Sequence, residues 1–138
     1  LEKLIDYFET QDEPTVIVFF GDHQPTDAVV EPIWNLEGKS SSDLTEEENQ
    51  LRYKVPYVIW ANYDIDEAVN QESSANYLGA QMMEAAGIPL SDYQNYLLEQ
   101  KKEMPLISTQ HTKAEGSDAW LNYQTLQYYL LFDWDGEK

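Results

Sequence analysis

The chain has 138 residues, enough for one domain with a core of its own. Hydrophobic residues make up 42% of it and aromatic residues 13%, which is too rich in core-forming side chains for a disordered polypeptide. The 26 Asp and Glu residues outnumber the 8 Lys and Arg residues, so the formal net charge is −18. This charge argues against nucleic acid as a partner, because duplex binding relies on basic side chains that neutralise phosphates. The sequence contains no cysteine, which excludes disulfides and thiolate metal sites.

The chain opens with a predicted helix and a predicted strand. Apolar residues from Leu1 to Phe8 recur at helical spacing, and the helix is expected to end near Asp12 to Pro14. The run Thr15 to Phe20, TVIVFF, is β-branched and aromatic without polar alternation. Such a run is typical of a strand buried on both faces of a mainly parallel sheet.

A long loop and a second strand follow. Residues 24–42 are polar and interrupted by Pro and Gly, which predicts a loop with one helical turn near Val29 to Trp34. Thr45 and Glu48 have the spacing of a capping box and predict a short helix. The run Pro56 to Ala61, PYVIWA, again has the composition of a buried strand.

Three helices are predicted for the second half of the chain. The first is capped by Ser73 or Ser74, the next by Ser91, and an aromatic-rich helix runs from Trp120 to Phe132. This order of elements indicates α/β packing. Two strands make a poor sheet by themselves, so we expect the remaining strands elsewhere in a longer protein.

The beginning of the sequence supports the same expectation. Leu1 lies within a helical pattern and is not an initiator Met, which suggests a piece excised from a longer protein. The longest strongly apolar run, Val16 to Phe20, is far below the roughly 20 residues that a membrane-spanning helix needs. A membrane anchor is therefore expected upstream.

An Asp-His pair directly follows the first predicted strand, in the order Phe20-Gly21-Asp22-His23. Open α/β sheets place their sites at the carboxyl ends of strands. Neighbouring side chains point to opposite faces of a strand, so the pair can share one ion only if the chain curls, and we expect Gly21 to permit that curl. A carboxylate oxygen and an imidazole nitrogen suit Mn²⁺ or Zn²⁺, and Mg²⁺ less well. The dipeptide alone is also compatible with an Asp that caps the following turn and a His on the surface.

Three stretches carry a wider resemblance to a known family, namely TVIVFFGDHQP, RYKVPYVIWANYDI and SSANYLGAQMMEAAGIPLSDYQNYLLE. They resemble the C-terminal region of the lipoteichoic-acid-synthase-like branch of the sulfatase and alkaline-phosphatase superfamily. The resemblance runs from Leu1 through Leu131, and its most specific element is the strand followed by Gly-Asp-His-Gln-Pro. It implies an α/β fold, a partial alkaline-phosphatase-like sheet with flanking helices. Residues 1–138 would then be the C-terminal segment of a sulfatase-like catalytic domain.

The resemblance also implies a metal site and a reaction. Asp22 and His23 match two ligands of a divalent metal, commonly Mn²⁺, with Mg²⁺ or Zn²⁺ as alternatives. A further acidic ligand and a Thr or Ser nucleophile belong to the family's upstream half, which has no counterpart here, and neither Thr15 nor Thr26 matches the nucleophile motif. In the implied reaction the metal-activated hydroxyl attacks the phosphorus of a phosphoglycerol lipid headgroup, and the covalent intermediate is passed to an acceptor. This chain alone is expected to be inactive.

Three other residues are weaker candidates for substrate binding. His111 lies in a polar stretch, Trp34 in the long loop, and Lys54 directly before the second strand. Each also has an ordinary interpretation: a solvated loop His, a packing anchor and a solvent-facing Lys.

The substrate class stays open among phosphoglycerol transfer, phosphoethanolamine transfer and sulfate ester hydrolysis, because fold does not decide substrate. The resemblance implies that the full-length protein acts at the extracytoplasmic face of the cell membrane. An alternative from another class is a non-catalytic cell-surface module that binds cell-wall polymer or protein through its aromatic C-terminal helix and acidic surface. We also expect the sheet edge beside Thr15 to Phe20 to be open within one chain and to meet another copy, because open edges recruit strands.

Overall fold

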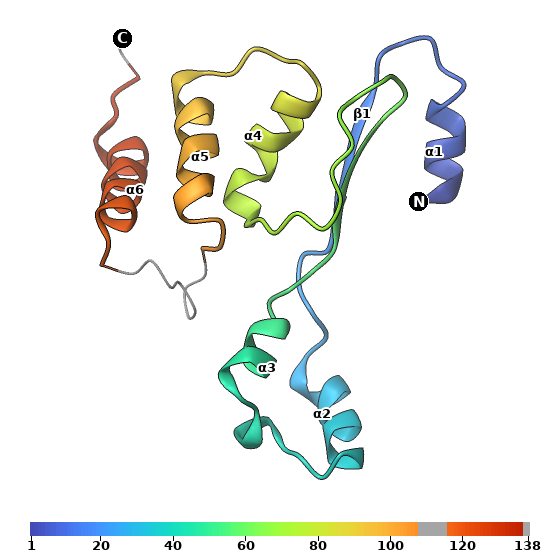
Figure 1. Ribbon diagram of the computed structural model, residues 1–138, viewed down its shortest axis with the longest axis vertical. Helices are drawn as coiled ribbons and strands as arrows, with labels where there is room; N and C mark the ends of the chain where they lie inside the picture. Colours follow the sequence, from blue (N-terminus) through green and yellow to red (C-terminus); the bar gives the residue numbers. More distant parts are fainter. Residues whose placement is uncertain (108–115, 137–138) are drawn as a thin grey trace. The chain divides into compact units, whose positions relative to one another are not determined.

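The computed structural model describes residues 1–107 and 116–136 and divides the chain into two units, Leu1–Asn62 and Tyr63–Lys138 (Figure 1). The N-terminal unit holds a strand pair and three of the described α-helices. Its elements in chain order are α1 (Glu2–Phe8), β1 (Val16–Phe20), α2 (Asp27–Leu36), the 3₁₀ turn η1 (Ser41–Asp43), α3 (Glu46–Leu51) and β2 (Tyr57–Ala61). The C-terminal unit is helical where it is described. Its elements are α4 (Ala75–Ala85), α5 (Asp92–Glu103), α6 (Asp118–Tyr128) and the π-helical turn η2 (Tyr129–Asp133). The expected α/β class is confirmed.

The two strands form an antiparallel ladder, in which Val16 lies opposite Ala61 and Phe20 opposite Tyr57. The expectation of parallel strands is wrong for this pair. Residues 21–56 leave the ladder through α2 and come back through α3 to the same end, so the second strand runs back along the first (Figure 1). Among the described residues β1 pairs with β2 alone, which leaves one edge of each strand open, as expected for β1.

The strand faces are also less covered than expected. Phe19 and Phe20 of β1 expose 51% and 52% of their surface, and Val58 of β2 exposes 41%. The expected burial on both faces is therefore wrong for this chain, since no residue of Leu1–Asn62 is fully buried. Large apolar groups at the surface of a strand mark a surface that another element is able to cover.

Helix α2 is longer than the single turn predicted near Val29 to Trp34, since it spans Asp27–Leu36 and continues through Pro32. Proline lacks the N–H that would bond back to the preceding turn, which is why the sequence predicts a break here. The helix persists on both sides of Pro32, and its Val30 and Trp34 face the same cavity as side chains near α3. Packing of one helix face here outweighs the local preference.

The capping predictions hold at two helices and differ at a third. Thr45 and Glu48 form the expected reciprocal capping box at α3, and Ser91 does the same with Gln94 at α5. Ser74 is the N-cap residue of α4, but its side chain makes no capping bond there. Its Oγ instead accepts the backbone N–H of Ile107 at 2.6 Å, so it fixes the chain after α5.

The core of the C-terminal unit lies among α4, α5 and α6. Its buried hydrophobic side chains are Tyr77, Ala80, Leu97, Met104 and Tyr123. The Tyr77 hydroxyl donates to the Met104 carbonyl at 2.8 Å, so its polar end is satisfied inside the core. Burial raises the pKa of Tyr77 and also that of Tyr123.

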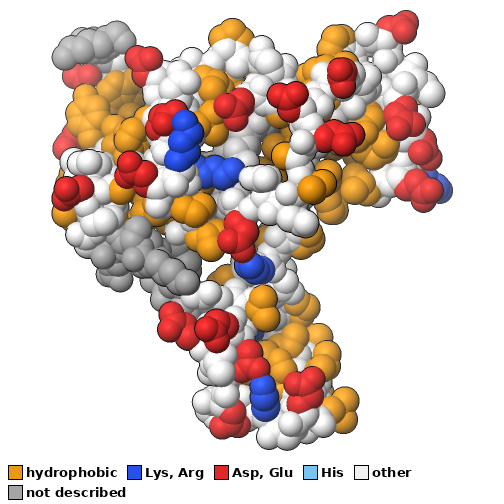
Figure 2. Space-filling model, viewed as in Figure 1, with side chains coloured by type: hydrophobic (Ala, Val, Ile, Leu, Met, Phe, Trp, Pro, Cys, Tyr) orange, Lys and Arg blue, Asp and Glu red, His pale blue; other side chains and the backbone are white. Residues whose placement is uncertain are grey.

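Acidic side chains are spread over the visible face of the molecule and few basic ones interrupt them (Figure 2). Apolar side chains also reach this surface (Figure 2). On α2, Val29 and Ile33 each expose 59% of their surface and Leu36 exposes 88%. None of the described helices is long and apolar enough to cross a membrane.

Candidate functional site

The Asp-His pair begins where the ladder ends. The backbone N–H of Gly21 donates to the Pro56 carbonyl at 3.0 Å, which continues the strand pairing by one residue beyond Phe20. A Cβ atom at position 21 would lie 3.0 Å from the Cβ of Val55, a tight contact that requires Val55 to move by a few tenths of an ångström. Gly21 does not have positive φ, so the close approach of Val55 favours glycine here, and an unusual backbone turn does not.

The side chains of Asp22 and His23 come together directly after this glycine. Oδ2 of Asp22 lies 3.4 Å from Nε2 of His23, and Oδ1 of Asp22 accepts the backbone N–H of His23 at 2.8 Å. Both side chains are open to solvent, exposing 81% and 74% of their surface. The two functional groups share one accessible side, as the strand-Gly-Asp-His order predicts. Their role as metal ligands stays a prediction.

The imidazole of His23 is oriented by the next residue. Its Nδ1 lies 2.9 Å from the Gln24 carbonyl oxygen, which can only accept a hydrogen bond, so Nδ1 carries a proton in this arrangement. In the neutral ring the lone pair is then on Nε2, the nitrogen that faces Asp22. A carbonyl on the far ring nitrogen is the usual second-shell partner of a metal-binding histidine.

Gln24 itself is tied to the other strand. Its Nε2 donates to the backbone carbonyl of Lys54, three residues before β2 begins. Gln24, whose carbonyl orients His23, therefore connects the segment that follows β1 to the segment that precedes β2. The sequence prediction missed this role for Gln24, although its position beside the pair in the Gly-Asp-His-Gln-Pro stretch is a signal that was available.

A third ligand for the pair is not found in the part of the chain that the structure describes. Residues 1–107 and 116–136 contain no group of three or more His, Asp or Glu side chains placed to hold one metal ion. Among the described residues, the candidate ligands are therefore one carboxylate and one imidazole.

A second polar cluster, also missed from the sequence, holds the other end of the ladder. Nδ2 of Asn62 donates to the carbonyls of Phe8 and Gln11 at 3.1 and 3.0 Å and to that of Glu13 at 3.0 Å. Oδ1 of Asn62 accepts the backbone N–H of Thr15 at 2.8 Å. One side chain after β2 thus fixes the end of α1 and the start of β1. Asn62 thus lies at the end of the ladder opposite the Asp-His pair.

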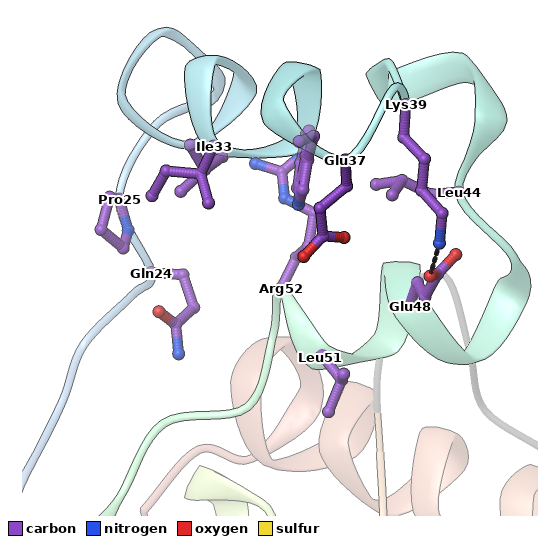
Figure 3. A pocket seen from close by; sticks show the side chains of 11 residues that line it. Gln24, Pro25, Ile33, Glu37, Lys39, Leu44, Glu48, Leu51 and Arg52 are labelled. Carbon is purple, nitrogen blue, oxygen red and sulfur yellow. Dashed lines mark hydrogen bonds and ion pairs between the residues drawn. The ribbon is translucent and has the colours of Figure 1, made fainter.

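A cavity of about 380 Å³ lies between α2 and α3, next to the pair in the chain (Figure 3). Gln24 belongs to its wall as well as to the His23 contact. The apolar part of its wall consists of Pro25, Val30, Ile33, Leu44 and Leu51. Its volume lies within the range of small-molecule sites, about 300–1,000 Å³.

The three weaker candidates have different outcomes. Trp34 is half-buried in the cavity wall, and the guanidinium of Arg52 lies 5.2 Å from the centre of its ring. Lys54 is exposed, and its backbone carbonyl accepts a hydrogen bond from the side chain of Gln24. His111 lies outside the described residues. Of these three candidates, Trp34 lines the cavity and Lys54 does not.

The two hydroxyls nearest the pair in the sequence are those of Thr15 and Thr26. Thr15 lies at the opposite end of β1, where its Oγ1 donates to the Glu13 carbonyl at 3.0 Å. Thr26 is the N-cap residue of α2, and its side chain makes no capping bond. Neither placement supports the role of a nucleophile facing the Asp-His pair.

A protein family model matches the part of the chain that contains the ladder and the Asp-His pair. The family model described as Sulfatase matches residues 1–88, which include the ladder, the Asp-His pair and the cavity. The chain belongs to the sulfatase family, in a superfamily of hydrolases and transferases whose members generally depend on a metal ion. No curated protein and no solved structure matches the chain.

Proposed function

We propose that Asp22 and His23 are metal ligands of a metal-dependent phosphoglycerol transferase or related sulfatase-like enzyme. The observation that carries this proposal is the 3.4 Å separation of Asp22 Oδ2 and His23 Nε2 on one exposed side of the chain. Family membership supports an enzyme that acts on esters of phosphate or sulfate. The finer assignment to phosphoglycerol lipid headgroups rests on the resemblance of the Gly-Asp-His-Gln-Pro stretch.

The geometry of the pair fits a divalent ion. Two metal–ligand bonds of about 2.1 Å that meet at the tetrahedral angle place their ligand atoms about 3.4 Å apart. Asp22 Oδ1 is occupied by a backbone N–H, which leaves Oδ2 as the ligand atom, and the Gln24 carbonyl leaves Nε2 of His23 as the other. An oxygen and an imidazole nitrogen favour Mn²⁺ or Zn²⁺ over Mg²⁺, and we propose Mn²⁺.

When bound there, a divalent cation supplies positive charge for the anionic oxygens of the ester. The residues of this chain hold the ligand atoms in place: Asp22 and His23 directly, Gln24 through its carbonyl and its link to Lys54. A bound cation would also offset the net charge of −18, which repels an anionic substrate at long range. A bound dication dominates the potential close to the site.

The remaining catalytic groups are proposed to come from another part of a sulfatase-like catalytic domain, of which residues 1–138 form the C-terminal segment. The exposed Phe19 and Phe20 of β1 and its open edge support this, because they offer a surface for further strands. In the isolated chain we propose that a second copy covers the same surface. We place the full-length protein at the extracytoplasmic face of the cell membrane, on the basis of the resemblance alone.

The experiment that tests the metal site is a Mn²⁺ titration of the chain followed by electron paramagnetic resonance, which separates free from bound ion. We expect the native chain to bind one Mn²⁺ weakly at a saturable site, since the ligand set is incomplete in the described residues. Asp22→Asn and His23→Gln should each remove that site. A non-catalytic binding module, the alternative suggested by the exposed aromatic residues Tyr128, Phe132 and Trp134, needs neither side chain.

The matched control is Asp12→Asn, which removes one exposed carboxylate from the loop before β1. It accounts for the diffuse attraction of an acidic surface to any dication. Binding curves that coincide for the native chain, Asp22→Asn and Asp12→Asn would overturn the metal-site proposal.

A further inference from the structure

The cavity between α2 and α3 is lined by two ion-paired cations and one further carboxylate. Lys39 forms an ion pair with Glu48, and Arg52 forms one with Asp27 beside the cavity. The carboxylate of Glu37 points into the same space (Figure 3). Because each cation already has a carboxylate partner, the cavity offers no surplus positive charge to a phosphate or sulfate group.

The rest of the wall is apolar and open to solvent. Ile33 and Leu51 expose 59% and 60% of their surface, so a ligand is able to reach them without any rearrangement of a core. The indole of Trp34 also lines the cavity. An apolar wall with a carboxylate at hand fits a carbon skeleton that carries hydroxyl groups, because a carboxylate accepts hydrogen bonds from O–H donors.

The cavity is joined to the proposed metal site by one residue. Gln24 lines the cavity, its carbonyl oxygen lies 2.9 Å from Nδ1 of His23, and its side chain is bonded to the Lys54 carbonyl. A ligand in the cavity is therefore next to the groups that we propose to hold the ester's charged centre. The two places differ in chemistry: we propose that the first binds a metal ion, whereas each cation of the second already has a carboxylate partner.

We infer that this cavity binds the uncharged alcohol portion of the ester substrate, a hydroxyl-bearing group with an apolar carbon chain. The inference rests on the proposed function, which puts the charged phosphoryl or sulfuryl group at Asp22 and His23. It favours an ester of a glycerol-like alcohol over one of a cationic amino alcohol. The ion-paired wall provides neither a free cation for an anion nor a cage of carboxylates for an amine.

The test uses 1-O-butylglycerol, a neutral glycerol ether, as probe and ¹H–¹⁵N NMR of the whole 138-residue chain as readout. We expect saturable shifts at the Trp34 indole N–H and the Gln24 side-chain amide. Inorganic phosphate and ethanolamine should give smaller shifts at these two groups. Tighter binding of either ion than of the ether would overturn the inference, and so would the absence of saturable shifts with the ether.

Two variants on one helix provide the matched pair. Ile33 and Val29 are both β-branched, lie four residues apart on α2 and are each 59% exposed, but Ile33 alone of the two lines the cavity. Ile33→Ser should weaken binding of the ether about tenfold through the loss of apolar contact. Val29→Ser should leave it unchanged. Equal losses in both variants would show binding to the outer surface of α2 and overturn the inference.

The same samples separate this inference from the proposed function. Asp22→Asn should lose the Mn²⁺ site and keep the ether, because the probe has no charged centre. A chain that binds Mn²⁺ at Asp22 but not the ether overturns only the cavity assignment. A chain that binds the ether but shows no Mn²⁺ site dependent on Asp22 overturns the proposed function, and with it the cavity's assignment to an ester substrate.

Discussion

Asp22 and His23 are neighbours in the chain, yet Oδ2 of one lies 3.4 Å from Nε2 of the other. Neighbouring residues of a strand point to opposite faces, so this approach requires that the chain has left the strand by residue 22. The last ladder contact is made at Gly21, where the close approach of Val55 leaves little room for a side chain. The end of the strand and the start of the site are thus set by the same residue.

The first prediction concerns Gln24. Gln24→Met keeps the length of the side chain but cannot donate to the Lys54 carbonyl, so the loop that orients His23 loses its link to the start of β2. We expect the affinity for Mn²⁺ to fall about tenfold, at the low end of second-shell effects. The measurement is the Mn²⁺ titration described above.

The control for this change is Gln11→Met. Gln11 also donates its amide to a backbone carbonyl of the N-terminal unit, that of Tyr7 at 3.1 Å, but at the other end of the ladder. Its replacement should leave the affinity for Mn²⁺ unchanged. Equal effects of the two variants would mean that Gln24 acts through general stability and not through the orientation of His23.

The second prediction compares two glycines whose surroundings differ. Gly21→Ala places a Cβ 3.0 Å from that of Val55, and we expect a loss of about 1–3 kcal/mol in the free energy of unfolding, the usual range for overpacking. Gly79→Ala, in the interior of α4, meets no atom within 4 Å and lacks positive φ, so it should stabilise by about 0.5–1 kcal/mol.

Urea denaturation followed by circular dichroism measures both glycine variants. Adding Val55→Gly to Gly21→Ala removes the opposing Cβ and should recover part of the loss relative to Val55→Gly alone. If Gly21→Ala is as stable as the native chain, the close approach at the end of the ladder is not a constraint.

The third prediction concerns Asn62. Asn62→Ala leaves the backbone N–H of Thr15 and three carbonyls near α1 without their side-chain partner. We expect a destabilisation of about 1–3 kcal/mol, the cost of leaving such groups unpaired. Asn62→Asp should be at least as damaging, because a carboxylate cannot donate to those carbonyls. Asn35→Ala on the exposed face of α2 is the control and should change stability little. Similar thermal melts for Asn62→Ala and Asn35→Ala would contradict the role of Asn62.

These relationships mark the boundary of what the sequence predicts. Strand composition located β1 and β2 to within a residue, and the spacing of Thr45 and Glu48 located α3, because both signals are local. The antiparallel pairing was not predicted, since composition says how deeply a strand is buried and not which way its neighbour runs. The contacts of Asn62 with Phe8 and Gln11 join residues more than fifty positions apart, and no local pattern announces them.

In the candidate site, too, local features can be predicted from the sequence and non-local packing cannot. The order Gly21-Asp22-His23 after a strand was enough to predict that the two side chains share an accessible side. The cavity between α2 and α3 was not predicted, because Pro32 argued against a helix of that length and residues 24–42 were interpreted as a loop. Trp34 was named as a candidate, but only the packing of α2 opposite α3 shows what surrounds it.

The last prediction is a pH dependence at the wall of the cavity. The hydrogen bond from Lys39 and that from the Thr45 backbone lower the pKa of Glu48 from its ordinary 4.5, and the bond to Glu48 raises the pKa of Lys39 above 10.5. A lowered carboxylate pKa contributes stability above pH 4.5 that is lost as the pH falls through the folded value. A raised ammonium pKa contributes stability below pH 10.5 that is lost as the pH rises through the folded value. The pair therefore stabilises the cavity wall between these limits. Its effect should be small and weakened by salt, since both groups face solvent.

We expect the stability difference between the native chain and Lys39→Met to be larger at pH 7 than at pH 3, as measured by urea denaturation at low ionic strength. Lys102→Met, which breaks the exposed pair with Glu99 on α5, is the matched control outside the cavity and is measured in the same way. A stability difference for Lys39→Met that is the same at pH 3 and pH 7 would show that the ion pair with Glu48 does not hold the wall together.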